Sequence, residues 1–357
     1  MNDKSNKQPT KGRGATVSPS NRYASHTRAP EDDGWYRDDA DAPAPATELA
    51  VDHSRTVISY NTSPDVPFDR SINPYRGCEH GCVYCFARPT HAYLGLSPGL
   101  DFETKLFYKP DAVAQLRVEL NARSYRSAPM AVGINTDAYQ PVERRLQLTR
   151  SILELLVACQ HPFTVVTKSA LIERDVDLLA RAAQRRQVSV AVSITTLDRE
   201  LARKMEPRAA APQRRLEVIS KLSAAGVPVT VLVAPVIPAL TDHELESILE
   251  AARAAGAGDA GYVVLRLPHE LKEIVGDWLT THHPLRAEHV MNRVRDMRGG
   301  AEYRAEFGER MRGSGVFADL LQRRFDVTYR RLGFARGTDL DITSFVPPGD
   351  ARQLTLF

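Results

Sequence analysis

The chain has 357 residues, enough for one large domain or two ordinary ones with an extensive hydrophobic core. Its net charge of +3 is too small to indicate a nucleic-acid partner by itself, and no run of about 20 apolar residues predicts a membrane helix. The N-terminus lacks the apolar stretch of a secretory signal, and three of the four cysteines are clustered rather than spread as a disulfide framework. These features predict a cytoplasmic protein without membrane association.

Residues 1–50 are poor in aliphatic side chains and rich in Ser, Asp, Pro, Lys and Ala. The segment is basic at its start and acidic towards its end. Such a composition cannot bury enough apolar surface to offset the entropy lost on ordering. We therefore predict a disordered N-terminal tail, in which Trp35 and Tyr36 are the one pair suited to anchor it locally.

From residue 51 onward, short apolar runs and helical patterns alternate. Residues 56–60 and 105–108 have the composition of short strands, and Pro110 begins a predicted helix that runs to about residue 123. Further strands are predicted at 130–134, 163–167, 188–194, 227–233 and 262–267. Helices are predicted at 143–159, 172–186, 198–205, 213–225, 242–255 and 269–280. Continuous β-branched strands separated by one-sided helices indicate a parallel sheet buried on both faces, either a barrel or a doubly wound sheet.

Residues 285–335 form a helical, arginine-rich section in which acidic side chains are interleaved with basic ones. This spacing is typical of an exposed helix face stabilised by ion pairs between residues three or four apart. A groove for nucleic acid is the alternative interpretation. We interpret the nearby His282, His283 and His289 as surface or packing residues, because adjacent histidines do not share one helical face.

Three cysteines lie within eight residues, in the spacing C-x3-C-x2-C formed by Cys78, Cys82 and Cys85. Gly77 and Gly81 supply the permissive backbone that a tight wrap around a metal needs. Thiolates suit iron–sulfur clusters, zinc or Cu(I). Three thiolates would leave one iron of a [4Fe–4S] cube open for a substrate or a cofactor, which is unlike a plain electron carrier.

A zinc site is the alternative interpretation of the same cysteines. Its fourth ligand would be His80 or His91. Structural zinc sites usually pair their ligands in two separated doublets, and this spacing does not. The motif therefore favours an iron–sulfur cluster.

The sequence around the cysteines resembles that of radical S-adenosylmethionine (SAM) enzymes. The resemblance covers Asn73-Pro74-Tyr75-Arg76-Gly77-Cys78 and then Tyr84-Cys85-Phe86-Ala87-Arg88. Within that superfamily the sequence is similar to the spore-photoproduct-lyase-like branch, often labelled DNA repair photolyase. The resemblance implies that the three cysteines hold a [4Fe–4S] cluster, that SAM binds the fourth iron, and that reduction cleaves SAM to a 5′-deoxyadenosyl radical. It also implies a partial (β/α)6 barrel of the TIM type over about residues 70–270.

We accordingly predict three sections, a disordered tail at 1–50, a radical SAM core at 51–280 and a helical, arginine-rich extension at 281–357. The resemblance implies flavodoxin or ferredoxin as the electron donor and nucleic acid as a candidate substrate, and the substrate itself stays open. The alternative function is a non-catalytic protein that binds a metal, as an Fe–S cluster or Zn, and interacts with nucleic acid.

Functional side chains of a barrel lie at the carboxyl ends of its strands, so each strand exit supplies candidates for SAM binding. Asn135, Thr136 and Asp137 follow the second strand, where their oxygens would accept from the SAM ammonium; a capped turn is the alternative. Lys168 follows the third strand and Ser193 ends the fourth. An ammonium and a hydroxyl there suit the carboxylate or the ribose of SAM.

Two more candidates for SAM binding come from the sequence motifs. Tyr84 is the aromatic residue directly before the last cysteine. Arg208 ends a Glu-Pro-Arg run that resembles one of the family, and its guanidinium would bind the methionyl carboxylate bidentately. The stiff apolar run at 234–238, after the fifth strand, is suited to packing against adenine.

The resemblance stops at the path that returns hydrogen to the product. Spore photoproduct lyase uses a cysteine near the end of the second barrel strand and a tyrosine directly after the last cluster cysteine. Here Ile134 ends that strand and Phe86 follows Cys85. Cys159 is predicted to be a buried residue at the far end of the next helix, towards the opposite face of the barrel. We therefore predict a substrate other than spore photoproduct, or hydrogen return by another route.

Overall fold

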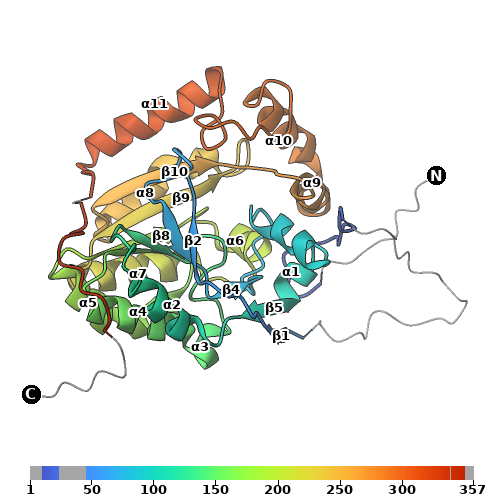
Figure 1. Cartoon of the computed structure of the whole chain (residues 1–357). Coiled ribbons are helices and arrows are strands. Elements are labelled where there is room, and N and C mark those ends of the chain that lie inside the picture. The colour runs from blue at the N-terminus through green and yellow to red at the C-terminus, as the bar shows by residue number, and fades with distance from the viewer. Residues whose placement is uncertain (1–9, 24–45, 338, 350–357) are drawn as a thin grey trace, which may run out of the picture.

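The computed structural model describes residues 10–23, 46–337 and 339–349. Its main sheet consists of β2 (Ile58–Tyr60), β3 (Arg70–Ile72), β6 (Met130–Val132), β7 (Phe163–Thr167), β8 (Val188–Ser193), β9 (Val229–Val236) and β10 (Asp259–Val264). From β3 to β10 these strands are parallel and neighbours in chain order, while β2 pairs antiparallel with β3 at one edge (Figure 1). A doubly wound sheet reverses its strand order in the middle, and this sheet does not. The predicted partial (β/α)6 barrel is confirmed.

Helices alternate with these strands and cover the outside of the sheet (Figure 1). They are α2 (Ala112–Leu120), α4 (Leu148–Ala158), α5 (Val176–Ala183), α6 (Arg199–Met205), α7 (Pro212–Ala224) and α8 (Leu245–Ala254). Each of the longer ones turns one apolar side inward; in α4, Ile152, Leu153 and Leu156 are fully buried. In β7, β8 and β9, fully buried residues alternate with half-buried ones, so one face of the sheet is more completely covered than the other.

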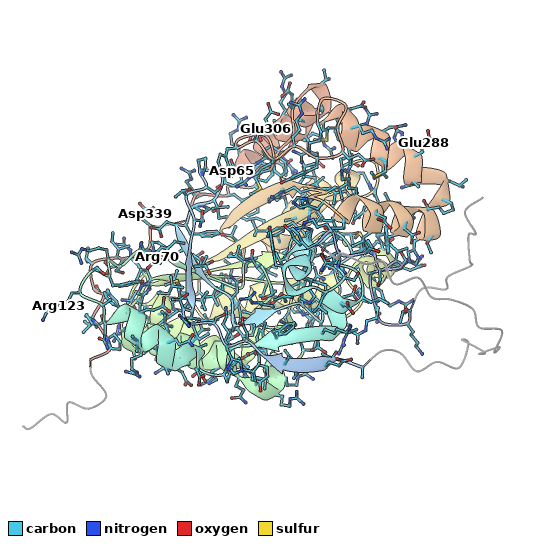
Figure 2. The ribbon with its side chains drawn as sticks, turned by 45° about the vertical axis from the view of Figure 1, so that its right-hand side comes forward. Asp65, Arg70, Arg123, Glu288, Glu306 and Asp339 are labelled. Atoms are coloured by element: carbon cyan, nitrogen blue, oxygen red, sulfur yellow. The ribbon has the colours of Figure 1, made fainter. Side chains whose placement is uncertain are left out.

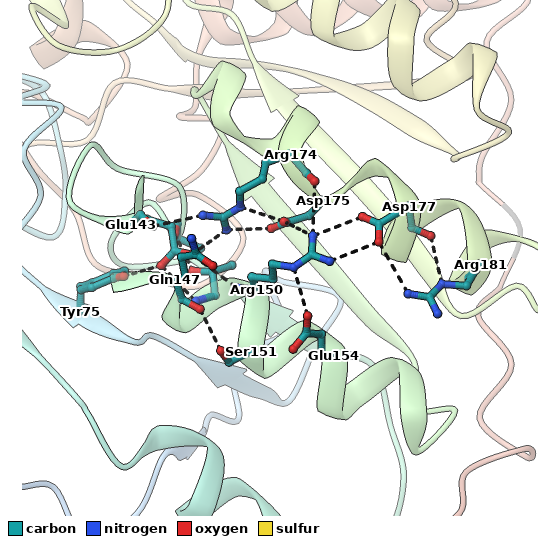
Figure 3. A network of polar contacts seen from close by, with 12 residues as sticks. Tyr75, Glu143, Gln147, Arg150, Ser151, Glu154, Arg174, Asp175, Asp177 and Arg181 are labelled. Atoms are coloured by element: carbon teal, nitrogen blue, oxygen red, sulfur yellow. Dashed lines mark hydrogen bonds and ion pairs between the residues drawn. The ribbon is translucent and has the colours of Figure 1, made fainter. Parts of the chain in front are cut away.

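The expected single helix at 143–159 is wrong at one point, because the chain forms α3 (Glu143–Leu146) and then α4. Gln147 lies between them with a φ of 53°, in the left-handed region. The fully buried carboxylate of Glu143 accepts from the Tyr75 O–H and pairs with Arg174 at 2.7 Å. Figure 3 shows this network, which ties the helical layer to the strand that precedes the cysteines.

A second, three-stranded sheet consists of β1 (Glu48–Val51), β4 (Tyr75–Arg76) and β5 (Lys105–Tyr108). β1 is parallel to β5, and β4 is antiparallel to it. The 3-10 helix η2 (Arg88–Leu94) and the short α1 (Asp101–Thr104) lie between β4 and β5 in the chain. This sheet holds the cysteine loop in place, because the loop begins where β4 ends.

The prediction of a disordered tail over 1–50 is wrong for the described part of that segment. Residues 48–50 belong to β1, and residues 10–23 pack against the barrel. Arg22, for example, makes an ion pair with Glu270 at 2.8 Å. Ion pairs and hydrogen bonds of this kind hold residues 10–23 against the barrel. The low content of aliphatic residues therefore did not predict disorder correctly for this part of the segment. The predicted Trp–Tyr anchor lies outside the described residues.

After β10 the chain forms α9 (Leu271–His282), α10 (Pro284–Asp296) and α11 (Val316–Arg331). The helical expectation for 285–335 is wrong between 297 and 315, where the chain is a glycine-containing loop. Asp65, which lies between β2 and β3 in the chain, packs against this loop (Figure 2) and accepts from the Gly308 N–H at 2.7 Å.

The arginines of α11 bind mainly to the neighbouring helix α8. Arg324 pairs with Glu246 at 2.6 Å, and Arg331 pairs with Glu250 at 2.5 Å. The expected pairing within one helix occurs as well, for instance between Arg293 and Asp296 at 3.4 Å. Within the described ranges, no helix combines the length and the hydropathy needed to cross a bilayer.

Candidate functional site

The three cysteines of the motif lie in one loop, residues 77–87, called here the cysteine loop. All three are free thiols; two are buried and Cys85 is half-buried. Gly77 and Gly81 have φ angles of 77° and 67°, which side chains disfavour. A Cβ on Gly77 would lie 2.6 Å from Leu106 Cδ2. Both glycines are therefore required by the tight turns of the loop.

Arg88 is fully buried and holds the backbone of the cysteine loop. Its Nε donates to Cys82 O at 2.8 Å, and its Nη2 donates to Gly81 O at 3.1 Å. Its other donors reach Gly99 O at 2.9 Å and the carboxylate of Glu103 at 2.5 Å. A buried guanidinium needs such a full set of acceptors. Sequence reasoning does not identify this role, because most of the acceptors are backbone carbonyls.

Glu103 joins the cysteine loop to the N-terminal segment. Besides Arg88, its fully buried carboxylate binds the Gly14 N–H at 3.0 Å and the Ala15 N–H at 2.8 Å. Gly14 lies so close to the loop that a Cβ there would stand 1.8 Å from Gly81 O. Residues 10–23 therefore cover the cysteine loop directly.

The polar run after β6 holds the other side of the cysteine loop. Gln140 Oε1 accepts from the Glu79 N–H at 2.9 Å, and Gln140 Nε2 donates to Gly77 O at 3.2 Å. Thr136 Oγ1 donates to Tyr75 O at 2.9 Å, just before the loop begins. Thr136, a predicted SAM contact, thus has its hydroxyl proton committed to the protein backbone.

Asp137 is surrounded by donors of the protein itself. Its carboxylate accepts from Thr167 Oγ1 at 2.8 Å and from the Lys168 N–H at 2.7 Å, and His80 Nδ1 lies 3.3 Å away. Burial acts to raise the pKa of Asp137, but His80 and the hydrogen bonds outweigh it and hold that pKa below its usual value. Asn135, by contrast, exposes its side chain.

Lys168 lies at the carboxyl end of β7 and collects groups from the neighbouring strands. Its Nζ donates to Ser193 Oγ and, at 3.2 Å, to Ala234 O. The same atom lies 3.9 Å from Glu206 Oε1 and 5.7 Å from the ring centroid of Tyr84. The fold therefore brings three predicted SAM contacts together, from the cysteine loop, β7 and β8.

Glu206 is the centre of this arrangement. It accepts from the Tyr84 O–H, from Thr195 Oγ1 at 2.9 Å and from the guanidinium of Arg215. Arg215 is 1% exposed and also donates to Ser193 O at 2.9 Å. Sequence reasoning missed Arg215, because nothing in the amphipathic pattern of α7 marks one of its arginines as buried. We call the following residues the mouth network: Tyr84, Lys168, Ser193, Thr195, Glu206 and Arg215.

The electrostatics of the mouth network act on its lysine. Burial lowers the pKa of Lys168 to about 8, Arg215 acts in the same direction, and Cys82 and Asp137 oppose it. A buried ammonium is screened little by water, so it attracts an anionic group of a ligand more strongly than an exposed lysine does.

Arg208 does not join the mouth network. Its guanidinium pairs with Glu79 at 3.1 Å, and its backbone N–H donates to His80 O at 3.3 Å. The side chain lines a separate cavity of about 390 Å³ on the flank of the cysteine loop.

The thiols fit an iron–sulfur cluster better than a single ion. His91 Nε2 lies 3.0 Å from Lys105 O and His80 faces Asp137, so neither histidine completes a zinc site. In the part of the chain that the structure describes, no three Cys, His, Asp or Glu side chains converge as one bound ion requires. A cube spreads its cysteine ligands over different irons, so they stand farther apart. Burial raises the pKa of all three thiols, and the positive charge of iron would favour their thiolate form.

A half-barrel of parallel strands, with three free cysteines and a buried lysine at its mouth, defines an enzyme class that holds a metal cluster together with a second cofactor. The chain belongs to the radical SAM superfamily, whose family model matches residues 72–252. Enzymes of this superfamily use a [4Fe–4S] cluster and SAM for radical chemistry, so these are its cofactors.

Related proteins share much of this core. The chain is 43% identical over 221 residues to an uncharacterized protein of Mycobacterium tuberculosis, which covers 61% of this chain and 65% of that protein. It is 27% identical over 173 residues to an uncharacterized protein of Methanocaldococcus jannaschii, covering 48% and 62%. The chain thus spans somewhat less than two thirds of the length of these curated relatives.

Solved structures show the same fold. Spore photoproduct lyase complexed with dinucleoside spore photoproduct matches with a TM-score of 0.56 and 16% identity, covering 80% of this chain and 79% of that chain. A C-to-S variant of spore photoproduct lyase matches with a TM-score of 0.51 and 18% identity, covering 80% and 78%. At such identities the likeness concerns the fold.

Proposed function

We propose that Cys78, Cys82 and Cys85 hold a [4Fe–4S] cluster and that the protein cleaves SAM reductively. The bound cluster and SAM together supply a 5′-deoxyadenosyl radical, while the chain supplies binding, orientation and exclusion of water. One observation carries the proposal: three free thiols lie in a loop whose backbone a buried arginine clamps, at the mouth of a radical SAM barrel.

We propose that the mouth network orients SAM. Lys168 has an ammonium suited to the carboxylate or a ribose oxygen, and Ser193 has a hydroxyl suited to the ribose. Asn135 has an exposed amide that suits the ammonium of SAM. Asp137 acts through Lys168, whose backbone it binds, and Thr136 acts through the strand before the cysteine loop.

For the substrate, we propose nucleic acid as the class to test first, because the fold matches a spore photoproduct lyase complexed with a dinucleoside. The reaction differs in our proposal. Phe86 is 40% exposed and lies under the Arg266 guanidinium, and β6 continues into Gly133 and Ile134 without a cysteine. Catalytic conversion of dinucleoside spore photoproduct by the reduced, SAM-loaded protein would contradict this.

We also propose the division into a catalytic core at 51–280 and an extension at 281–357, because the main sheet lies within the former. Free thiols and a cluster that must be reduced fit the reducing cytoplasm.

Anaerobic reconstitution with iron and sulfide tests the cluster. We expect about four irons per chain and a brown protein. Cys78→Ala, Cys82→Ala and Cys85→Ala should each abolish it. Cys159→Ala is the matched control, because Cys159 is buried just before β7, at the opposite end of the strands. Stoichiometric zinc in place of iron, or iron loss in the Cys159 variant, would refute the assignment.

A further inference from the structure

Among the described residues, the lining of the cavity beside Arg208 holds three arginines and one carboxylate. Its lining consists of Thr47, Leu49, Glu79, Pro141, Val142, Arg144, Arg145 and Arg208. Arg208 is paired with Glu79. Arg144 and Arg145 are exposed, and within the described ranges neither side chain makes a hydrogen bond or an ion pair. We call Arg144, Arg145 and Arg208 the basic rim.

The basic rim borders the cysteine loop. Glu79, which pairs with Arg208, is the residue next to Cys78 in the chain. α3, which carries the other two arginines, starts shortly after Gln140, and the side chain of Gln140 binds the Glu79 N–H. The cavity shares no lining residue with the mouth network. The rim therefore lies near the proposed cluster but outside the place proposed for SAM.

This position distinguishes an electron donor from a substrate. Hydrogen abstraction requires the substrate to touch the radical, so the substrate must enter the mouth. An electron, in contrast, can tunnel across a residue such as Glu79. A charged surface that adjoins the cysteine loop without opening on the mouth network suits electron delivery.

We propose that the basic rim is the docking surface for an acidic one-electron carrier of the flavodoxin or ferredoxin kind. The inference rests on the proposed function. The reduced carrier loses one electron and the cluster gains it, changing from [4Fe–4S]2+ to [4Fe–4S]+, with no atom or proton transferred. Complexes of this kind have small, polar interfaces, and their association is steered by charge.

Two features of the rim fit this role. Arg144 and Arg145 can bind carboxylates of a partner without breaking an ion pair to any residue in the described ranges. The positive potential extends to Arg13, whose pKa is lowered first by burial and then by repulsion from Arg208. Arg13 Nη2 lies 3.5 Å from Thr47 Oγ1, so it stands at the edge of the same cavity.

The test is the double variant R144E/R145E in the full, reconstituted chain. We expect flavodoxin to bind at least about tenfold more weakly at low salt, with a reduced salt dependence. Reduction of the cluster by flavodoxin hydroquinone should slow by a similar factor, whereas iron content and reduction by dithionite stay unchanged. Binding is measured by calorimetric titration and reduction by stopped-flow absorbance.

The matched control is R123E/R185E. Both arginines are exposed, and their side chains make no hydrogen bond or ion pair in the described part of the chain. Arg123 and Arg185 precede β6 and β8, so they lie at the amino ends of the strands, and Figure 2 shows Arg123 pointing to solvent. This variant should behave as the wild type does with flavodoxin.

Unchanged flavodoxin binding and reduction in R144E/R145E would overturn the proposal. Loss of oligonucleotide binding with unchanged flavodoxin kinetics would also overturn it and assign the rim to phosphates. A wild-type protein that takes up no cluster, or that dithionite cannot reduce, would instead refute the proposed function.

Discussion

The cysteine loop and the C-terminal helices both rely on arginine–carboxylate pairs, but they use them differently. The Arg88–Glu103 pair beside the cysteines is completely buried. The Arg331–Glu250 pair between α11 and α8 has the same 2.5 Å separation, with its side chains 54% and 48% exposed. The first pair binds six backbone groups of three segments in addition, whereas Arg331 binds no further group within the described residues.

The difference shows that the number of arginines in a region does not indicate how much they contribute to its stability. Water screens an exposed pair, and holding two long side chains together costs entropy, so such pairs contribute little. Removing one partner of a buried pair leaves a charge without compensation, which is strongly destabilising. The C-terminal extension contains many arginines, yet the single Arg88 beside the cysteines contributes more to holding the site together.

The largest effect is expected from Glu103→Ala. The change leaves the buried Arg88 guanidinium and two backbone N–H groups without their acceptor, and should lower the free energy of unfolding by roughly 3–5 kcal/mol. Urea unfolding of the cluster-free protein measures it. Glu103→Gln, which keeps the shape and one acceptor, should lose less. Equal stability of wild type and Glu103→Ala would remove the basis of the comparison.

His161 extends the comparison to a buried neutral group. Burial lowers its pKa to about 4, below the 6.5 of an exposed histidine. As the pH falls, the unfolded chain therefore takes up the proton first. The stability contributed by neutral His161 is complete above about pH 6.5 and is lost towards pH 4, by about 3 kcal/mol at most.

His161→Gln separates this contribution from other titrating groups. Its stability, measured by urea unfolding between pH 7.5 and pH 4.5, should fall less on acidification than that of the wild type. The same loss in both proteins would show that burial does not hold the pKa of His161 below that of an exposed histidine.

Lys168 combines burial with a proposed ligand. Lys168→Met keeps a long side chain at this position but removes its charge. It should weaken SAM binding to the reconstituted protein by roughly 1.5–3 kcal/mol. Equilibrium binding of SAM is the measurement. Lys221→Met, on the exposed side of α7, should bind SAM normally. Full affinity in Lys168→Met would exclude this residue from the SAM site.

The smallest effect is expected for Arg331→Ala. Loss of the exposed pair with Glu250 should change the free energy of unfolding by about 0–1 kcal/mol. High salt should reduce even that difference. A loss as large as that of Glu103→Ala would mean that exposure does not separate the two regions.

Local patterns were sufficient for most of the barrel. The strand expected at 163–167 coincides with β7, and that at 188–194 differs from β8 by one residue, because buried β-branched runs mark parallel strands strongly. The helix over 143–159 could not be predicted to break at Gln147. That break depends on the buried Glu143 meeting Arg174, a contact between different elements.

For the site, the sequence by itself was sufficient to propose the cluster ligands, because three cysteines and two glycines within nine residues suit few other chemistries. It also placed Lys168 and Ser193 at strand ends, where the barrel geometry makes them neighbours. Only the tertiary structure decided that Arg88, Glu103 and Arg215 are buried, that Arg208 faces Glu79 rather than the mouth, and that residues 10–23 cover the cysteine loop. The physical reason is that a polar residue is buried or exposed according to partners far away in the chain, and local periodicity carries no information about those partners.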